Sequence, residues 1–218
     1  MKMARAATAW VFLFFGAIAA GQTTIPLADI KAAEPTIVVE LRYAGRNNIT
    51  GRPLYPDGTR AMVQPDLIPR LKAAQKFLRQ FDYRLKIWDA YRPPSVQRQL
   101  WRAIQNDSYV ANPELGAGSL HSWGLAVDCT LTDLHNREVR MPTDFDEFRP
   151  AAMSQYAGPD KLIRSRLRLL RVAMAGSGFY AFRHEWWHFT VKNWAKYLPP
   201  AEAARVARTF GSPTKENL

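Results

Sequence analysis

Two short segments of this 218-residue chain concentrate the side chains that could bind a metal ion. His121 lies in the run Ser-Leu-His-Ser-Trp-Gly-Leu-Ala-Val-Asp, which ends at Asp128, and His188 ends the run His-Glu-Trp-Trp-His, which begins at His184. The single cysteine, Cys129, excludes an intramolecular disulfide and a cysteine-rich zinc scaffold. Any metal ion in this protein must therefore bind to histidine and carboxylate side chains.

Asp128 and two of the histidines provide the ligand set of a catalytic zinc site. Asp128 stands in an otherwise apolar segment, where a carboxylate is costly unless it is paired or bound to a metal. A catalytic zinc ion takes three protein ligands and keeps one position open for water. His121, Asp128 and His188 meet this requirement, and Glu185 remains as the general base. His184 is a rival to His188 as the third ligand.

Two structural interpretations compete with the metal site. His121 could cap a buried Asp128 from a loop, and the segment around His188 could be an aromatic core strand with incidental polar neighbours. Each of these explains one segment alone, whereas a zinc site explains both segments together with a suitable base. The remaining histidine, His135, lies in the turn Asp133–Asn136 and is expected at the surface.

The spacing of Glu185 and His188 sets a condition on the backbone between them. Residues three apart share a face on a helix but point to opposite faces on an ideal strand. The two tryptophans between them favour a strand. We therefore expect a bulge or a bend between Glu185 and His188.

The elements that must position these residues alternate irregularly along the chain. Residue patterns predict strands at 36–43, 83–88, 125–131 and 186–191, and a turn at 133–138 that leads into a partner strand. Apolar spacing predicts helices at 66–80, 95–106, 160–175 and 200–210, of which Asp66 and Ser95 cap the first two. No regular strand–helix–strand rhythm appears. We therefore expect an α+β fold in which a small mixed or antiparallel sheet carries the zinc site and is flanked by helices.

The first 20 residues have the layout of a secretory signal peptide. Lys2 and Arg5 precede the uncharged segment 6–20, which contains Ala-Ile-Ala at 17–19, small residues of the kind that a signal peptidase recognises. The segment is short for a membrane span, which needs about 20 apolar residues, and an uncleaved anchor is the alternative. We expect residues 1–20 to be removed and residues 21–218 to form a single exported, periplasmic domain that carries the zinc site and has no membrane span.

The formal net charge is +11, from 30 lysines and arginines against 19 acidic residues. This excess is consistent with a solvated basic surface or with attraction to a polyanion such as nucleic acid or an anionic envelope. The basic residues are mostly dispersed, and no ribbon of alternating basic and aromatic residues of the single-strand-binding kind is present. We therefore expect no nucleic-acid partner.

The two metal-binding segments resemble those of the zinc D,D-peptidases of the M15 peptidase class. The resemblance is carried by Ser119-x-His121-x6-Asp128 and by Glu185-Trp-Trp-His188. The branch that looks closest is that of the D-Ala-D-Ala dipeptidases of the vancomycin-resistance type. Four further segments are similar to that branch and extend the resemblance to roughly residues 30–192: Leu41–Ala44, Asn48–Gly51, Asp89–Pro93 and Thr143–Asp146.

Carried over position by position, the resemblance implies one Zn2+ per chain, bound by His121, Asp128 and His188. It implies that Glu185 acts as the general base and acid. It also implies that Arg92 faces the scissile carbonyl and hydrogen-bonds the oxyanion that forms there.

The resemblance also places Ser119, Tyr43 and Asp146 near a dipeptide substrate. Asp146 would pair with the free ammonium group, and Ser119 would hydrogen-bond the substrate. The implied activity is zinc-dependent hydrolysis of D-alanyl-D-alanine, a cell-wall precursor dipeptide. One alternative is a D,D-carboxypeptidase or murein endopeptidase that acts on longer peptidoglycan peptides. Another is a non-catalytic, zinc-stabilised binding module of the envelope, against which Glu185 and Arg92 argue because metal retention needs neither.

Overall fold

The computed structural model describes residues 25–106, 109–114 and 118–210, and within them a five-stranded sheet forms the centre of the molecule. Its strand order is β2-β4-β5-β7-β6; β2 is parallel to β4, and all other neighbours are antiparallel. The strands are β2 (Val38–Val39), β4 (Tyr83–Asp89), β5 (Ala126–Asp133), β6 (Phe179–Ala181) and β7 (His188–Val191). A separate short pair is formed by β1 (Ala28–Asp29) and β3 (Met62–Val63). The predicted α+β fold with a small mixed sheet is confirmed.

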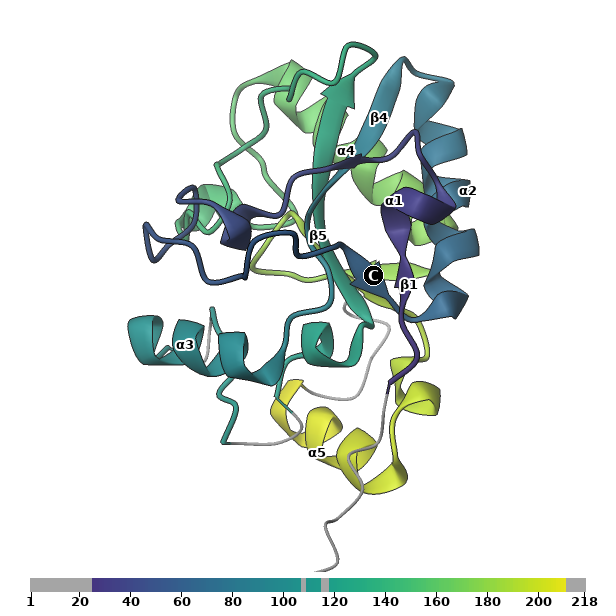
Figure 1. The fold of residues 1–218 in the computed structure, drawn as a ribbon. Helices are drawn as coiled ribbons and strands as arrows, with labels where there is room; N and C mark the ends of the chain where they lie inside the picture. Colours follow the sequence, from purple (N-terminus) through teal and green to yellow (C-terminus); the bar gives the residue numbers. More distant parts are fainter. Residues whose placement is uncertain (1–24, 107–108, 115–117, 211–218) are drawn as a thin grey trace, which may run out of the picture.

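Two longer helices lie side by side along the sheet (Figure 1). α2 (Ile68–Arg79) packs against β4, and α4 (Lys161–Gly176) packs against β6 and against α2. α3 (Pro94–Ile104) lies away from this pair. α5 (Pro200–Phe210) forms the carboxyl end of the described chain. The remaining helices are short: α1 (Ile30–Ala33) and the 3-10 helices Arg42–Ala44, Pro65–Leu67, Leu120–Trp123, Pro150–Ala152 and Trp194–Tyr197.

α4 shows how the sequence pattern determines packing. Asp160 caps the helix, because its carboxylate accepts hydrogen bonds from the backbone N–H groups of Leu162 and Ile163 at 2.9 and 3.1 Å. The buried face contains Ile163 and, at spacings of four, three and four residues, Leu167, Leu170 and Met174. The prediction of a helix at 160–175 is confirmed.

β5 is the central strand that carries the candidate ligand Asp128, and both of its faces are buried. Asp128 and Thr130 share one face, since alternate residues of a strand point the same way. The opposite face carries Cys129 between Val127 and Leu131, and all three are completely buried. Burial raises the pKa of the Cys129 thiol well above its ordinary value.

The strand predicted at 36–43 is wrong over most of its length. Val38–Val39 alone pair with β4, and the 3-10 helix Arg42–Ala44 follows. This turn places Arg42 2.7 Å from Glu138 and buries Tyr43 in the core. These tertiary contacts outweigh the preference of the branched residues for an extended chain.

Both predicted helix caps are wrong. Asp66 lies within the 3-10 helix Pro65–Leu67, and no side chain caps the α2 helix that follows. α3 begins at Pro94, so Ser95 lies inside its first turn. Proline suits that position because its φ angle is already helical and a hydrogen-bond donor is not needed there.

The strand predicted at 186–191 begins later than expected, and the partner strand expected after the turn at 133–138 is reduced to one bridge. β7 begins at His188, and Trp186 and Trp187 occupy the turn before it. The turn after β5 is closed by a 2.9 Å hydrogen bond from the Asp133 N–H to the Arg137 carbonyl. The chain then returns through a single bridge to β5 instead of the expected partner strand.

The predicted signal peptide at residues 1–20 lies outside the described residues. Among the helices that the structure describes, none combines the length and the apolar character needed to cross a membrane.

Candidate active site

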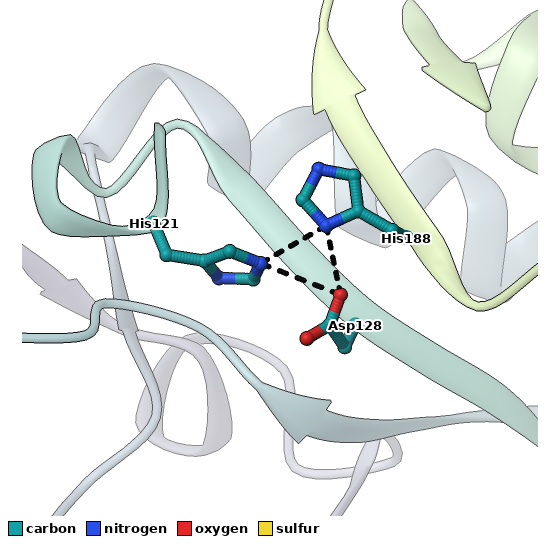
Figure 2. Close-up of side chains that lie close together, drawn as sticks. All are labelled: His121, Asp128 and His188. Carbon is teal, nitrogen blue, oxygen red and sulfur yellow. Dashed lines mark hydrogen bonds and ion pairs between the residues drawn. The ribbon is translucent and has the colours of Figure 1, made fainter. Parts of the chain in front are cut away.

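His121, Asp128 and His188 converge on one point, as Figure 2 shows. Nε2 of His121 lies 3.1 Å from Nδ1 of His188 and 3.3 Å from Oδ1 of Asp128. Nδ1 of His188 lies 3.0 Å from the same oxygen. Three ligand atoms held tetrahedrally at about 2.0 Å from a zinc ion would be about 3.3 Å apart. The three residues, called the triad below, therefore have nearly the spacing that zinc requires, and within the described chain they form the one such group.

His121 is positioned by the 3-10 helix Leu120–Trp123, which precedes β5. The Ser119 hydroxyl caps this turn by accepting a 3.2 Å hydrogen bond from the His121 N–H. Nδ1 of His121 lies 2.7 Å from the carbonyl oxygen of Ala90. Because a carbonyl can only accept, Nδ1 carries the proton, and the lone pair of Nε2 points at the other two triad atoms.

Gly124 connects this turn to β5 in a conformation that favours glycine, with φ at +65°. A Cβ atom at this position would lie 2.7 Å from Cδ2 of Leu27 and 3.2 Å from the backbone nitrogen of Gln64. The Gln64 N–H also donates a 3.0 Å hydrogen bond to the Gly124 carbonyl. The glycine therefore permits the close backbone approach between the turn carrying His121 and Gln64, which follows β3.

His188 is positioned by the sheet itself, since it is the direct partner of Asp128 across β5 and β7. Its Nε2 lies 3.1 Å from the Thr190 hydroxyl, and its Nδ1 points toward the triad centre. A hydrogen bond from the second ring nitrogen fixes the tautomer and orientation of a ligating histidine. Both triad histidines have such a partner.

Glu185 reaches the triad through a tight turn. The His188 N–H donates a 3.2 Å hydrogen bond to the Glu185 carbonyl, and the two tryptophans between them occupy the turn. Oε2 of Glu185 consequently lies 4.0 Å from Nδ1 of His188. The predicted bend between these two residues is confirmed. His184 is exposed, contacts the ring of Phe182, and is not part of the triad.

Burial and neighbouring charges set the proton affinities at this centre. Burial alone would raise the pKa of Asp128, but His121 and His188 outweigh it and hold that pKa well below its ordinary value. Burial lowers the pKa of His188 even though Asp128 opposes the shift. Burial also raises the pKa of Glu185 well above its ordinary value, and the charges of Asp128 and Asp146 add to this shift. Asp128 and His188 thus have the forms that bind metals, and Glu185 has the high proton affinity of a base.

Arg92 is buried and held from several sides beside the triad. Its Nε and Nη2 lie 2.9 and 2.7 Å from Oδ2 of Asp89, and its Nη1 donates a 2.9 Å hydrogen bond to Oε1 of Gln97. Nη2 also lies 3.5 Å from Oδ2 of Asp128. The guanidinium carbon stands 4.9 Å from the centre of the Tyr43 ring. Arg92 is therefore fixed between the triad and Tyr43.

Asp146 is a buried carboxylate at the hydroxyl end of Tyr43, whose ring contacts Arg92. The Tyr43 hydroxyl donates a hydrogen bond to one of its oxygens and the Ile49 N–H donates to the other, each at 3.2 Å. Burial raises the pKa of Asp146 to about 7, although the Ile49 N–H and Arg92 act against the shift. Among the described side chains, no cation forms an ion pair with it. Such a carboxylate is suited to a ligand that brings its own positive charge.

The structure brings the eight predicted site residues into one connected region. Ser119 contacts His121, Arg92 joins Asp128 to Tyr43, Tyr43 contacts Asp146, and Glu185 borders His188. A water molecule and a peptide carbonyl placed at the triad would meet a base on one side and a guanidinium on another. This arrangement is suited to metal-assisted hydrolysis of a peptide bond.

Sequence reasoning missed the residues that support this region. Asp89 is completely buried; it binds Arg92 and accepts a 2.5 Å hydrogen bond from the Tyr55 hydroxyl. A signal for Asp89 was present, because it is a carboxylate directly after the strand predicted at 83–88 and stands three residues before Arg92. Gln97 and Thr190 give no comparable signal, since an amide on a helix and a threonine in a strand are ordinary residues there.

A family model described as D-ala-D-ala dipeptidase, Peptidase M15, matches residues 23–206. The D-alanyl-D-alanine dipeptidase of Escherichia coli (strain K12) is 35% identical over 175 residues, which are 80% of this chain and 89% of that protein. The enzyme of the same name from Enterococcus faecalis is 31% identical over 170 residues, 69% of this chain and 83% of that protein. A solved structure of a mutant of the vancomycin resistance D,D-pentapeptidase VanY in complex with Zn(II) aligns with a TM-score of 0.41 and 15% identity, covering 69% of this chain and 86% of that one. The family match over most of the chain confirms the resemblance carried by the two metal-binding segments: the chain belongs to the D-Ala-D-Ala dipeptidase family of peptidase class M15.

Proposed function

We propose that this chain is a zinc-dependent peptidase that hydrolyses the dipeptide D-alanyl-D-alanine. Relatives that carry this activity in their names align with most of its length. The observation that supports a dipeptide substrate is the buried carboxylate of Asp146, which has no cationic partner among the described side chains and is joined to Arg92 through Tyr43. The free ammonium group of a dipeptide would supply the positive charge that Asp146 lacks.

His121, Asp128 and His188 would hold the zinc ion. Two imidazole nitrogens and one carboxylate oxygen are a donor set that zinc favours, and their spacing of 3.0 to 3.3 Å suits tetrahedral binding. The other ring nitrogens are already engaged by Ala90 and Thr190. When bound, zinc would polarise the peptide carbonyl and lower the pKa of a coordinated water toward neutrality.

Glu185 would transfer the proton during hydrolysis. Its carboxylate borders the triad, and burial gives it a high proton affinity. It would accept a proton from the attacking water and then donate that proton to the amine of the departing D-alanine. One carboxyl group would thus serve first as base and then as acid.

Arg92 would stabilise the negative charge that develops on the carbonyl oxygen. A guanidinium has five N–H donors, of which Asp89 and Gln97 take three. The remaining donors belong to nitrogens that are already held in position beside the triad. A donor that needs no reorganisation contributes about 3–4 kcal/mol to transition-state stabilisation in other enzymes.

The dipeptide would be bound by Asp146 and Ser119, with Tyr43 supporting Asp146. Asp146 would pair with the ammonium group, while the Tyr43 hydroxyl keeps the carboxylate oriented. The Ser119 oxygen accepts from the His121 N–H, so its hydroxyl proton is free to donate to the substrate. A longer peptide would leave Asp146 without its ammonium partner, which disfavours such substrates.

The enzyme would act after export, as a periplasmic domain of residues 21–218 released from a signal peptide at 1–20. The charged start, the uncharged segment and the small residues at 17–19 support this proposal. Determination of the amino-terminal residue of the protein from a periplasmic fraction tests it. A protein that retains Met1 in the membrane fraction would instead indicate an uncleaved anchor.

The activity is tested by release of free D-alanine from D-Ala-D-Ala with and without a chelator. We expect release that stops when the metal is removed and returns when zinc is added. N-acetyl-D-Ala-D-Ala is the comparison substrate because it lacks the ammonium group. Equal rates on both substrates would contradict a dipeptidase and indicate a D,D-carboxypeptidase that uses the same triad.

A further inference from the structure

Residues 109–111 connect the surroundings of Arg92 with the surroundings of Asp146 in the proposed dipeptide site. The Ala111 carbonyl accepts a 2.7 Å hydrogen bond from Nε2 of Gln97 on α3. The Tyr109 ring stacks on the Phe148 ring, with centroids 4.3 Å apart and planes 15° from parallel. Val110, between these two contacts, is buried. The segment is thus attached at both of its ends.

The Ala111 contact links the segment to Arg92. Gln97 is 1% exposed, and both ends of its amide are used: Nε2 donates to Ala111 and Oε1 accepts from Nη1 of Arg92. The same side chain therefore positions the guanidinium and holds this segment. This end of the segment lies on the side of the site where the scissile carbonyl would be.

The Tyr109 contact links the segment to Asp146. Phe148 follows Asp146 by two residues, and its N–H donates a 3.2 Å hydrogen bond to the Asp146 carbonyl. The Phe148 ring also lies 6.1 Å from the buried Trp187 ring, next to His188. Tyr109, Phe148 and Trp187 therefore form an aromatic row in which Tyr109, 37% exposed, is the outermost member.

We propose that the Tyr109–Phe148 stack closes the ammonium end of the site and sets the length of peptide that is accepted. This inference rests on the proposed dipeptidase function and assigns Tyr109 as a specificity-determining residue. On this proposal, a substrate with one more amino-terminal residue continues past Asp146 toward Phe148, whose N–H is hydrogen-bonded to the Asp146 carbonyl and whose ring is covered by Tyr109. The longer chain can fit only if the two rings separate.

Charge and length are different constraints, and two substrates separate them. N-acetyl-D-Ala-D-Ala lacks the ammonium group but is hardly longer than the dipeptide, so it measures the role of Asp146. Tri-D-alanine places its ammonium group one residue further out, so it loses the pairing with Asp146 and also meets the wall formed by Tyr109 and Phe148. The change in its cleavage on Tyr109→Ala, with Asp146 intact, measures the wall. The inference concerns the second substrate.

The experiment compares kcat/KM for D-Ala-D-Ala and tri-D-alanine in the zinc-loaded parent enzyme, Tyr109→Ala and Tyr109→Phe. We expect Tyr109→Ala to raise kcat/KM for tri-D-alanine at least about tenfold, because the stack is lost. Tyr109→Phe should retain the parent value, since the ring remains. Phe81→Ala is the matched control: Phe81 is also an exposed aromatic residue in contact with a second ring, that of Phe77, and lies just after α2.

The outcomes separate this inference from the proposed function. A parent enzyme that does not cleave D-Ala-D-Ala contradicts the function itself. If the parent cleaves the dipeptide, and a folded, zinc-containing Tyr109→Ala variant shows no gain on tri-D-alanine, the length inference alone is overturned. A gain that Phe81→Ala shows equally would overturn it too. A gain confined to Tyr109→Ala supports it.

Discussion

The proposed metal-binding end of this site, at the triad, and the proposed dipeptide-binding end, at Asp146, are built in different ways. Asp128 and His188 are partners across two hydrogen-bonded strands, so the sheet sets their separation. Asp146 is held by single hydrogen bonds from Tyr43 and Ile49, which precede it by 103 and 97 residues. Asp128 and His188 are thus attached to the sheet, whereas Asp146 lies in a turn outside it. Changes at the first end should affect every substrate, and changes at the second should alter the choice among substrates.

The largest effect is expected from Glu185→Ala, at the metal-binding end. Removal of the proposed general base should lower kcat for D-Ala-D-Ala by roughly a thousandfold or more. Zinc content should stay at one per chain, because Glu185 lies outside the triad. Steady-state kinetics and metal analysis measure the two quantities, with Glu202→Ala as a surface control. A zinc-loaded Glu185→Ala enzyme with parental turnover would remove Glu185 from the mechanism.

Arg92→Lys tests the residue that stands between the two ends. A lysine keeps the positive charge but not the fork that Asp89 and Gln97 hold in place. We expect kcat to fall by about a hundredfold or more, for the free and the acetylated dipeptide alike. Arg98→Lys, on the exposed side of α3, is the control. A loss confined to KM would mean that Arg92 binds substrate without stabilising the transition state.

The dipeptide-binding end is tested by Asp146→Asn. A buried ammonium–carboxylate pair loses about 3–5 kcal/mol when one partner is removed. In the parent enzyme, acetylation of the substrate should therefore lower kcat/KM by about a hundredfold or more, since 1.36 kcal/mol is a factor of ten. In Asp146→Asn the free dipeptide should be cleaved less well and the gap between the two substrates should narrow. An unchanged gap would assign the discrimination to another residue.

The smallest expected effect is a pH dependence of kcat/KM that arises at Asp146. The pKa of Asp146 is raised to about 7 by burial, so the carboxylate that pairs with an ammonium group is lost as pH falls through 7. kcat/KM for D-Ala-D-Ala should then drop about tenfold per pH unit below that value. Asp146→Asn should lack this limb of the profile. If kcat/KM of the Asp146→Asn variant still falls below pH 7, the titrating group would belong to the metal-binding end.

The sequence predicts the two metal-binding segments well because each segment carries its own local pattern, although the pairing of β5 with β7 brings the two together. His121 and Asp128 are separated by one turn and the start of one strand, and the spacing of Glu185 and His188 already required a bend. The apolar spacing of α4 likewise predicted its buried face. In each of these cases, residues close in sequence determine the geometry.

The features that the sequence did not predict depend on distant contacts. Tyr43 leaves the expected strand because its side chain is buried and its hydroxyl reaches Asp146. Asp89, Tyr55 and Gln97 acquire their roles only when the folded chain surrounds Arg92. No periodic pattern encodes such contacts, because the partners lie on separate elements.

Cys129 gives this molecule an internal reporter of strand opening. The thiol is completely buried on β5, beside Asp128, and burial raises its pKa. Since the thiolate is the reactive form, an alkylating reagent can modify it only after an opening has exposed this part of β5 to solvent. It is also the single cysteine of the chain, so the rate of alkylation counts openings of one known strand. Zinc should slow that rate, because binding at Asp128 stabilises the closed form.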